Sequence, residues 1–201
     1  MNKHLSTLIL CATLSLSVVA LNGCQTAIEG KDSVITDNYF DEMHQRLAKV
    51  EDLSLSGRLG IITATDRVSA FFSYDAHKDT FTLELASTFG SQLGVLTVNK
   101  DISVLKANNK VYKDKDPRNL LLTNFNIDVP VSMLKKIFLG IPDGDVVKDS
   151  NNQVLSTNVA GYDINYSSYQ EFNGYALPTQ MTVKNELNTI KLKVNEVTEI
   201  K

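Results

Sequence analysis

Apolar side chains recur along the chain at two spacings, and the change between them marks where helix gives way to strand. Phe40, Met43, Leu47 and Val50 recur every three or four residues, which is the spacing of one face of an amphipathic helix. Asp37 stands just ahead of them, where an N-cap is expected. The pattern therefore predicts a helix that begins near Asp37.

From about Leu53 the period shortens to two, as in a strand that buries one face. The clearest example is 190–194, where Lys191 and Lys193 separate three aliphatic side chains, so that one face is apolar and the other is wet. Further strands are predicted near 67–77, 81–85, 93–98, 102–106, 111–113, 154–158, 162–169, 177–184 and 189–197. These are expected to be consecutive antiparallel strands, with tight turns at 99–101 and 107–110.

Two helices are predicted to interrupt the strands, because each begins with a proline near its first turn. Pro117 opens the first, and Pro130 opens the second, which Gly140 closes. A polar loop is expected over 143–152. A long antiparallel sheet with one apolar face needs a cover, and about three helices are available to provide it. The expected fold is α+β, a curved antiparallel sheet that forms an open, unclosed half-barrel under these helices.

Such an arrangement can enclose an apolar cavity between the sheet and the helices, which is a common kind of ligand site. The same side chains could instead fill a packed core, and the pattern leaves both interpretations open. Strand and helix parity nominates eight side chains for the wall of the cavity: Phe72, Tyr74, Phe81, Leu83, Leu85, Leu96, Leu134 and Phe138.

The N-terminus has the features of a signal peptide. Lys3 and His4 precede the almost uncharged stretch 5–21, which is too short and too mildly apolar for a permanent membrane span. The run 21–24, Leu-Asn-Gly-Cys, resembles a lipobox, in which a small residue precedes a cysteine that receives lipid. The alternative is a general secretory signal with a cysteine near the cleavage point by chance, but lipidation of Cys24 is the preferred hypothesis.

Three segments follow from this interpretation. Residues 1–23 are the signal peptide, residues 24–36 are the lipidated N-terminus and a tether, and residues 37–201 are a single domain. Gln25 follows the cysteine where an aspartate would signal retention in the inner membrane, so the expected location is the periplasmic face of the outer membrane. Since Cys11 leaves with the signal peptide, no disulfide or cysteine metal site is expected in the mature chain.

Charge and motifs argue against two classes of protein. The net charge is −3, and the sequence contains no Lys/Arg-rich run of the kind that neutralises phosphates, so no nucleic-acid partner is expected. His44 and His77 are widely separated, and the sequence has no hydrolase elbow, zinc-protease motif or nucleotide-binding glycine pattern. The expectation is a protein with no catalytic residues, no metal and no cofactor.

Short pieces of sequence then follow one another in a recognisable order. They are 56–60 (SGRLG), 72–74 (FSY), 83–85 (LEL), 89–90 (FG), 129–131 (VPV), 138–142 (FLGIP), 161–166 (GYDINY), 177–178 (LP) and 190–193 (IKLK). With Cys24, their order and spacing over nearly the whole mature chain resemble the LolB family of outer-membrane lipoprotein receptors. The complete absence of Trp departs from many members of that family.

The resemblance implies a function. A receptor of this kind accepts lipoproteins from a LolA-like periplasmic carrier, holds their acyl chains in an apolar cavity, and inserts them into the outer membrane without nucleotide hydrolysis. It implies a monomer whose partners are the carrier, the acyl chains of the cargo and outer-membrane lipid. Two other classes remain open: a lipoprotein that binds another apolar ligand, and a structural lipoprotein of an envelope assembly.

The resemblance also nominates a membrane-insertion loop. Family members carry an exposed apolar residue in a Pro-Leu-Gly turn, and here the corresponding turn, 87–90, places Phe89 and Gly90 at those positions, with Thr88 in place of the proline. The alternative is that Phe89 folds inward, because it continues the parity of the apolar face over 81–85.

Overall fold

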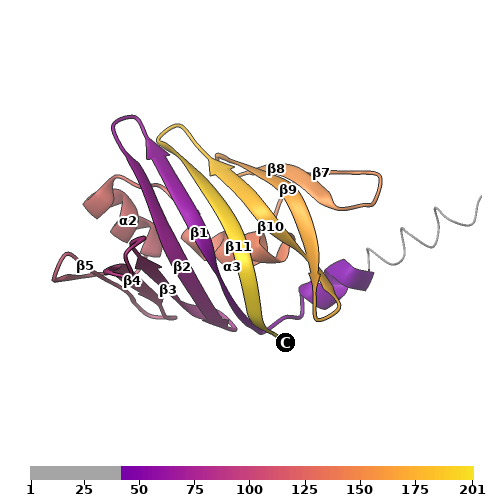
Figure 1. Ribbon diagram of the computed structural model, residues 1–201, viewed down its shortest axis with the longest axis horizontal. Helices are drawn as coiled ribbons and strands as arrows, with labels where there is room; N and C mark the ends of the chain where they lie inside the picture. The colour runs from indigo at the N-terminus through magenta and orange to yellow at the C-terminus, as the bar shows by residue number, and fades with distance from the viewer. Residues whose placement is uncertain (1–41) are drawn as a thin grey trace, which may run out of the picture. The chain divides into compact units, whose positions relative to one another are not determined.

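The computed structural model describes residues 42–201, which form one antiparallel sheet with helical segments across one of its faces (Figure 1). The predictions for the signal peptide, Cys24, the tether and the N-cap Asp37 lie outside the described residues. Residues 42–47 are helical, and Met43 and Leu47 are buried, as the amphipathic pattern predicted. Val50 is also buried but lies beyond the end of this helix.

Eleven strands make up the sheet, in which β1 to β6 pair in chain order, β7 to β11 pair in chain order, and β1 pairs with β11 to join the two series. They are β1 (Asp52–Thr63), β2 (Arg67–His77), β3 (Thr80–Ala86), β4 (Gln92–Val98), β5 (Ser103–Ala107), β6 (Lys110–Asp114), β7 (Val146–Lys148), β8 (Val154–Val159), β9 (Tyr162–Phe172), β10 (Tyr175–Lys184) and β11 (Asn188–Ile200). The order is β6-β5-β4-β3-β2-β1-β11-β10-β9-β8-β7, so β6 and β7 are unpaired edges and the half-barrel is open, as predicted.

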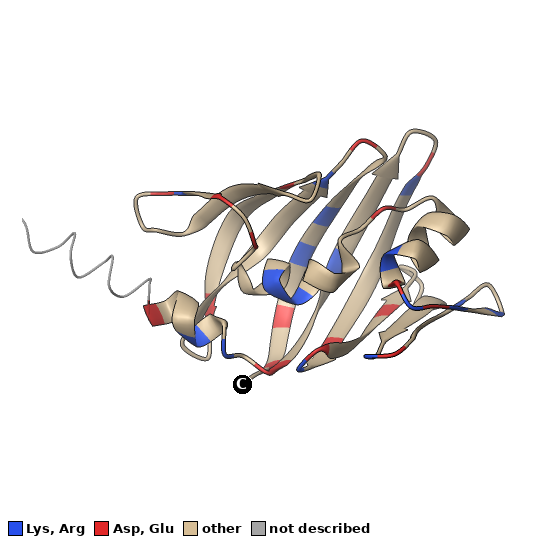
Figure 2. Cartoon of the chain, turned by 180° about the vertical axis from the view of Figure 1, so that it is seen from behind, with Lys and Arg blue, Asp and Glu red and all other residues tan. Residues whose placement is uncertain are grey.

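The helical segments lie in the connection from one edge strand to the other. They are α2 (Pro117–Phe125), the 3-10 turn η1 (Val131–Met133) and α3 (Leu134–Leu139), and residues 117–139 are called the lid below. Figure 2, drawn from behind, shows α2 and α3 in front of the sheet. The face that the lid covers is called the inner face, and the opposite one the outer face.

The ends of the lid helices follow from local chemistry. Asp116 caps α2 by accepting a hydrogen bond from the backbone N–H of Arg118, and Pro117 occupies the first turn. Gly140 ends α3 with a φ of 70°, a left-handed conformation that glycine adopts without a steric penalty.

Two predictions for this region are corrected. The single helix expected from Pro130 is a 3-10 turn followed by α3, because Met133 between them has φ −100° and ψ −3° and so departs from regular α-helical geometry. The expected polar loop over 143–152 contains β7, which pairs with β8. A strand of three residues is too short for alternation to reveal it.

The predicted alternation of buried and exposed residues is present in the sheet. In β2, Ala70, Phe72, Tyr74 and Ala76 are buried, whereas the residues between them are exposed. At the pairing of β1 with β11 the register shifts next to Gly57. A Cβ atom at Gly57 would lie 2.0 Å from the carbonyl oxygen of Lys193, so only glycine fits this close approach. Among residues 42–201, no helix has the length and apolar content needed to cross a bilayer.

Candidate functional site: a lidded apolar cavity

A cavity of about 380 Å³ lies between the inner face of the sheet and the lid. Its size falls in the lower part of the range for ligand pockets, which is about 300–1,000 Å³. Its wall is apolar apart from Asn108, and comprises Leu59, Ile61, Val68, Phe72, Leu83, Leu85, Leu93, Gly94, Leu96, Leu105, Ala107, Leu121, Phe125, Ile127, Val129, Leu134, Phe138, Val183, Ile190 and Leu192. Such a wall offers an apolar ligand contact on all sides and almost no hydrogen-bond partner.

Six of the eight nominated side chains lie in this wall: Phe72, Leu83, Leu85, Leu96, Leu134 and Phe138. The structure does not place Tyr74 and Phe81 there. Both point inward as parity predicted, but the Tyr74 ring packs against Phe81 and Phe138 at centroid distances of 5.1 and 5.0 Å, and so fills the space it could have left open. Burial also raises the pKa of Tyr74 well above its usual range, so this phenol stays neutral.

The rest of the wall was not predicted from the sequence. Leu59, Ile61, Ile190 and Leu192 share the inward parity of the nominated residues, and Leu121 and Phe125 come from the lid. Their apolar spacing was a visible signal. Whether an inward side chain touches a neighbour or a void depends on how far the lid stands from the sheet, which spacing does not reveal.

The cavity opens to solvent near the turn between β3 and β4. Val68 and Leu93 are wall residues, yet they are 45% and 39% exposed. Leu93 lies just beyond the turn 87–91, at the start of the strand that leaves it. The mouth of the cavity is therefore beside this turn.

Phe89 protrudes from that turn and is 95% exposed, which rules out the inward alternative. The strand β3 ends at Ala86, so strand parity no longer applies at Phe89. Ser87 holds the turn, because its Oγ accepts hydrogen bonds from the N–H groups of Phe89 and Ser91 at 3.3 and 3.1 Å. Gly90 has a φ of 81°, which suits glycine and closes the turn. A large apolar ring thus stands in solvent beside an apolar cavity.

The buried carboxylate of Asp128 ties the lid to the sheet. It accepts hydrogen bonds from Arg118 Nε and Nη2 at 2.6 and 2.8 Å, from the Tyr162 hydroxyl at 2.5 Å and from Asn185 Nδ2 at 2.9 Å. The Asp128 backbone N–H donates to Asn188 Oδ1 at 2.7 Å, and its carbonyl accepts from Asn188 Nδ2 at 3.0 Å. These partners come from α2, β9 and the β10–β11 hairpin, so one residue fixes the middle of the lid.

The charges of this cluster are well defined. The hydrogen bonds from Arg118 lower the pKa of Asp128, although burial acts in the opposite direction. Burial and the hydrogen bond to Asp128 raise the pKa of Tyr162. Asp128 is therefore an anion near neutral pH, and Tyr162 is a neutral donor to it. Sequence reasoning missed this cluster, although a lone acid in the apolar run 127–131 was a possible signal.

Within residues 42–201, no group of three or more His, Cys, Asp or Glu side chains is placed to hold a metal ion. The candidate site in the described part of the chain is thus a binding site. It consists of an open half-barrel, a helical lid and an apolar cavity with an apolar mouth. These features define a class of lidded half-barrel proteins that can enclose an apolar ligand.

Comparison with known proteins narrows this class to one family. The family model for the outer membrane lipoprotein LolB matches residues 51–196, and the chain belongs to the LolB family. This confirms the resemblance predicted from the sequence.

Relatives along nearly the full length carry the same name. The outer-membrane lipoprotein LolB of Aeromonas hydrophila is 28% identical over 185 residues, covering 90% of this chain and 92% of the relative. That of Francisella tularensis is 28% identical and covers 88% of both chains. Among solved structures, a LolA superfamily protein from Nitrosomonas europaea aligns with a TM-score of 0.49 at 6% identity, over 81% of this chain and 92% of that one.

Proposed function

We propose that this protein is an outer-membrane receptor that accepts lipoproteins from a LolA-like periplasmic carrier, shelters their acyl chains in the cavity, and releases them into the membrane. In this proposal a lipid on Cys24 holds the protein at the periplasmic face of the outer membrane. The protein acts by binding and not as an enzyme, and it hydrolyses no nucleotide. The observation that carries the proposal is the apolar cavity whose mouth lies beside the exposed ring of Phe89.

The energetics of acyl chains favour a relay of this kind. Leaving an acyl chain in water costs about 0.8 kcal/mol for each methylene, so a chain of ordinary length needs continuous shelter during transfer. The wall of the cavity would provide that shelter, because it is apolar apart from Asn108 and so desolvates few polar groups when a hydrocarbon enters. Because transfer needs only a higher affinity for the chains in the receptor than in the carrier, no energy source is required at this step.

The turn 87–91 supplies the exit in this proposal. An exposed phenylalanine ring is unfavourable in water, and its transfer into the interfacial region of a bilayer lowers the free energy. Phe89 would therefore draw the mouth of the cavity toward lipid, so that acyl chains move from the cavity into the bilayer with little exposure. Gly90 allows the turn to present the ring.

A two-stage transfer assay tests the proposal. Carrier loaded with labelled lipoprotein is mixed with a version of the protein that lacks its N-terminal lipid, and liposomes are then added. We expect wild-type protein to take the label without ATP and pass it to liposomes. The variant Phe89→Glu should take the label but fail to deliver it.

Val147→Glu is the matched control, because Val147 is also an exposed apolar residue, 59% exposed, but lies on the edge strand β7. It should behave like wild type in both stages. If no label moves to the wild-type protein, the receptor proposal is wrong. Binding of a free apolar dye without uptake of lipoprotein would then favour the alternative of a different apolar ligand.

A further inference from the structure

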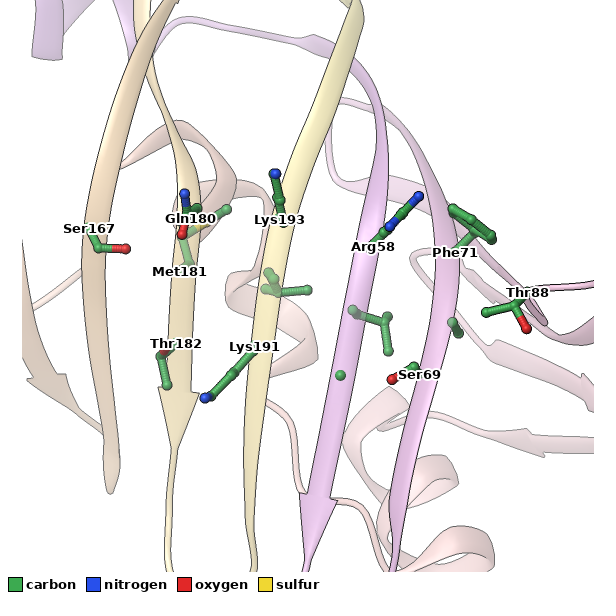
Figure 3. Close-up of a pocket in the computed structure, with 14 residues that line it drawn as sticks. Arg58, Ser69, Phe71, Thr88, Ser167, Gln180, Met181, Thr182, Lys191 and Lys193 are labelled. Atoms are coloured by element: carbon green, nitrogen blue, oxygen red, sulfur yellow. The ribbon is translucent and has the colours of Figure 1, made fainter.

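A second hollow, of about 760 Å³, lies on the outer face of the sheet, away from the lid (Figure 3). It is called the outer trough here and spans the strands β2, β1, β11, β10 and β9. Gly60 and Ser69 are small residues of its floor, whereas longer side chains flank them. Its polar lining comprises Arg58, Ser69, Thr88, Ser167, Gln180, Thr182, Lys191 and Lys193.

The outer trough is cationic and holds no compensating acid. Arg58, Lys191 and Lys193 line it, and none of its lining residues is Asp or Glu. Within residues 42–201, the salt bridges involve none of these three cations. The acidic residues Glu196 and Asp75 pair with Ser56 and Ser54 of β1, so they lie closer than Arg58 to the N-terminal end of that strand.

The register of the strands makes this arrangement costly for the isolated protein. Arg58 and Lys193 are direct partners across the β1–β11 pairing. Side chains in this relation have Cβ atoms about 4.5–5.5 Å apart, and like charges placed so destabilise a sheet. An anion lying between them would turn this repulsion into attraction. Gln180 and Thr182 add neutral hydrogen-bond donors beside the cations, a set that suits phosphate oxygens.

The outer trough is continuous with the turn that carries Phe89. Thr88 lines the trough and directly precedes Phe89 in the chain. Phe71, on the trough wall, is 37% exposed, and the guanidinium of Arg58 lies 5.0 Å from the centre of its ring. Cations, half-exposed aromatic surface and a protruding ring thus occupy one region of the molecule. Basic and aromatic side chains together are typical of surfaces that contact anionic lipid.

We propose that the outer trough binds the phosphate groups of anionic phospholipids, so that the protein rests on the membrane with the trough and Phe89 both against it. This inference rests on the proposed function for its assignment of Phe89 to the membrane. The trough would orient the cavity mouth toward the lipid, whereas an anchor at Cys24 would fix only the distance. A single basic side chain near an anionic surface changes a membrane equilibrium about fivefold, so the three cations together give on the order of 100-fold.

The absence of Trp from the sequence allows a direct measurement on the full lipidated chain. A Phe89→Trp substitution supplies the only indole, whose emission shifts to the blue when it enters lipid. The protein is reconstituted in vesicles of phosphatidylcholine, with or without phosphatidylglycerol. We expect phosphatidylglycerol to increase the blue-shifted fraction, and salt to reverse the increase.

The variant Arg58→Gln/Lys191→Gln/Lys193→Gln, made in the Phe89→Trp background, removes the three charges. It should lower the ratio of inserted to free indole on the order of 100-fold in vesicles with phosphatidylglycerol. The matched control is Lys100→Gln/Lys113→Gln/Lys115→Gln in the same background. It removes the same amount of charge from exposed lysines outside the trough. These lysines lie near the C-terminal ends of β4 and β6, which are far from the turn 87–91.

The outcomes separate this inference from the proposed function. An equal response to phosphatidylglycerol in both triple variants would overturn the inference, even if lipoprotein transfer works normally. The inference would also be overturned if the trough triple variant took up less lipoprotein from the carrier but responded to vesicles as wild type does. That result would assign the trough to an acidic protein partner. Quenching of the response by inorganic phosphate at low concentration would overturn it in favour of a site for the free ion. If the vesicle response holds but no lipoprotein is transferred, the trough stands and the receptor function fails.

Discussion

Substitution of Asp128 by asparagine tests whether one buried carboxylate holds the lid on the sheet. The change keeps the shape of the side chain but removes its charge and places an amide donor opposite Arg118 or Asn185. A hydrogen bond to a charged group contributes about 1.5–3 kcal/mol when it is buried. The Arg118 side chain is 48% exposed, which weakens its share through solvent screening. We therefore expect Asp128→Asn to lower the free energy of unfolding by about 2–3 kcal/mol.

The dependence of this effect on pH has a definite sign. The folded-state pKa of Asp128 lies below the unfolded value of about 4. Its ionic contribution to stability is therefore complete above pH 4 and disappears as the pH falls through the lower, folded value. The stability difference between wild type and Asp128→Asn should be constant from about pH 5 to 8 and should shrink in more acidic solution.

Urea denaturation followed by circular dichroism measures the difference, with Asp143→Asn as the control. Asp143 also accepts a short hydrogen bond from a cation, Lys136, but both side chains are about half exposed. An exposed pair of this kind contributes about 0–1 kcal/mol. If both variants lose the same small amount of stability, the proposed role of Asp128 in holding the lid is wrong. Hydrogen exchange should in addition show faster opening of residues 117–139 in Asp128→Asn alone.

Two further predictions concern the sheet and the cavity. Gly57→Ala should lower the free energy of unfolding by about 2–3 kcal/mol, because its methyl group would overlap the backbone carbonyl of Lys193; a loss below about 0.5 kcal/mol in urea denaturation would contradict the close approach. Leu121→Trp should reduce the uptake of an environment-sensitive apolar dye by filling part of the cavity, whereas Leu187→Trp, at a residue that is 45% exposed, should not; equal uptake by the two would show that the dye binds elsewhere.

Much of the sheet could be predicted because strand alternation is a local signal. The run 190–194 shows why: its aliphatic residues face inward and Lys191 and Lys193 face outward, as spacing alone indicated. Six of the eight side chains that the same logic nominated lie in the wall of the cavity. It failed for Tyr74 and Phe81 because parity gives the direction of a side chain but not the volume that its neighbours leave open.

Features built from distant segments escaped the sequence analysis. The partners of Asp128 on the sheet side, Tyr162, Asn185 and Asn188, are 34 to 60 residues away in the chain, so no spacing could connect them. The outer trough was missed for the same reason. Spacing alone predicts that Lys191 and Lys193 lie on an ordinary solvated face, whereas the pairing of β1 with β11 sets Lys193 opposite Arg58.

The exposure of Phe89 depended on where a strand ends. Apolar parity over 81–85 extends to position 89 and left an inward ring open as an alternative, but β3 stops at Ala86. Hydrogen bonds to Ser87 then turn the chain outward. The resemblance to the LolB family carried information that the pattern of this one sequence lacked.

The central claim is that acyl chains of a lipoprotein occupy the cavity under the lid. Its most direct test uses cargo whose acyl chain carries a photoreactive diazirine, loaded onto the carrier and passed to this protein before illumination. Mass spectrometry should find the cross-links on wall residues such as Leu83, Leu96 and Leu134. Cross-links confined to the outer face, or none on the protein after transfer, would contradict the account.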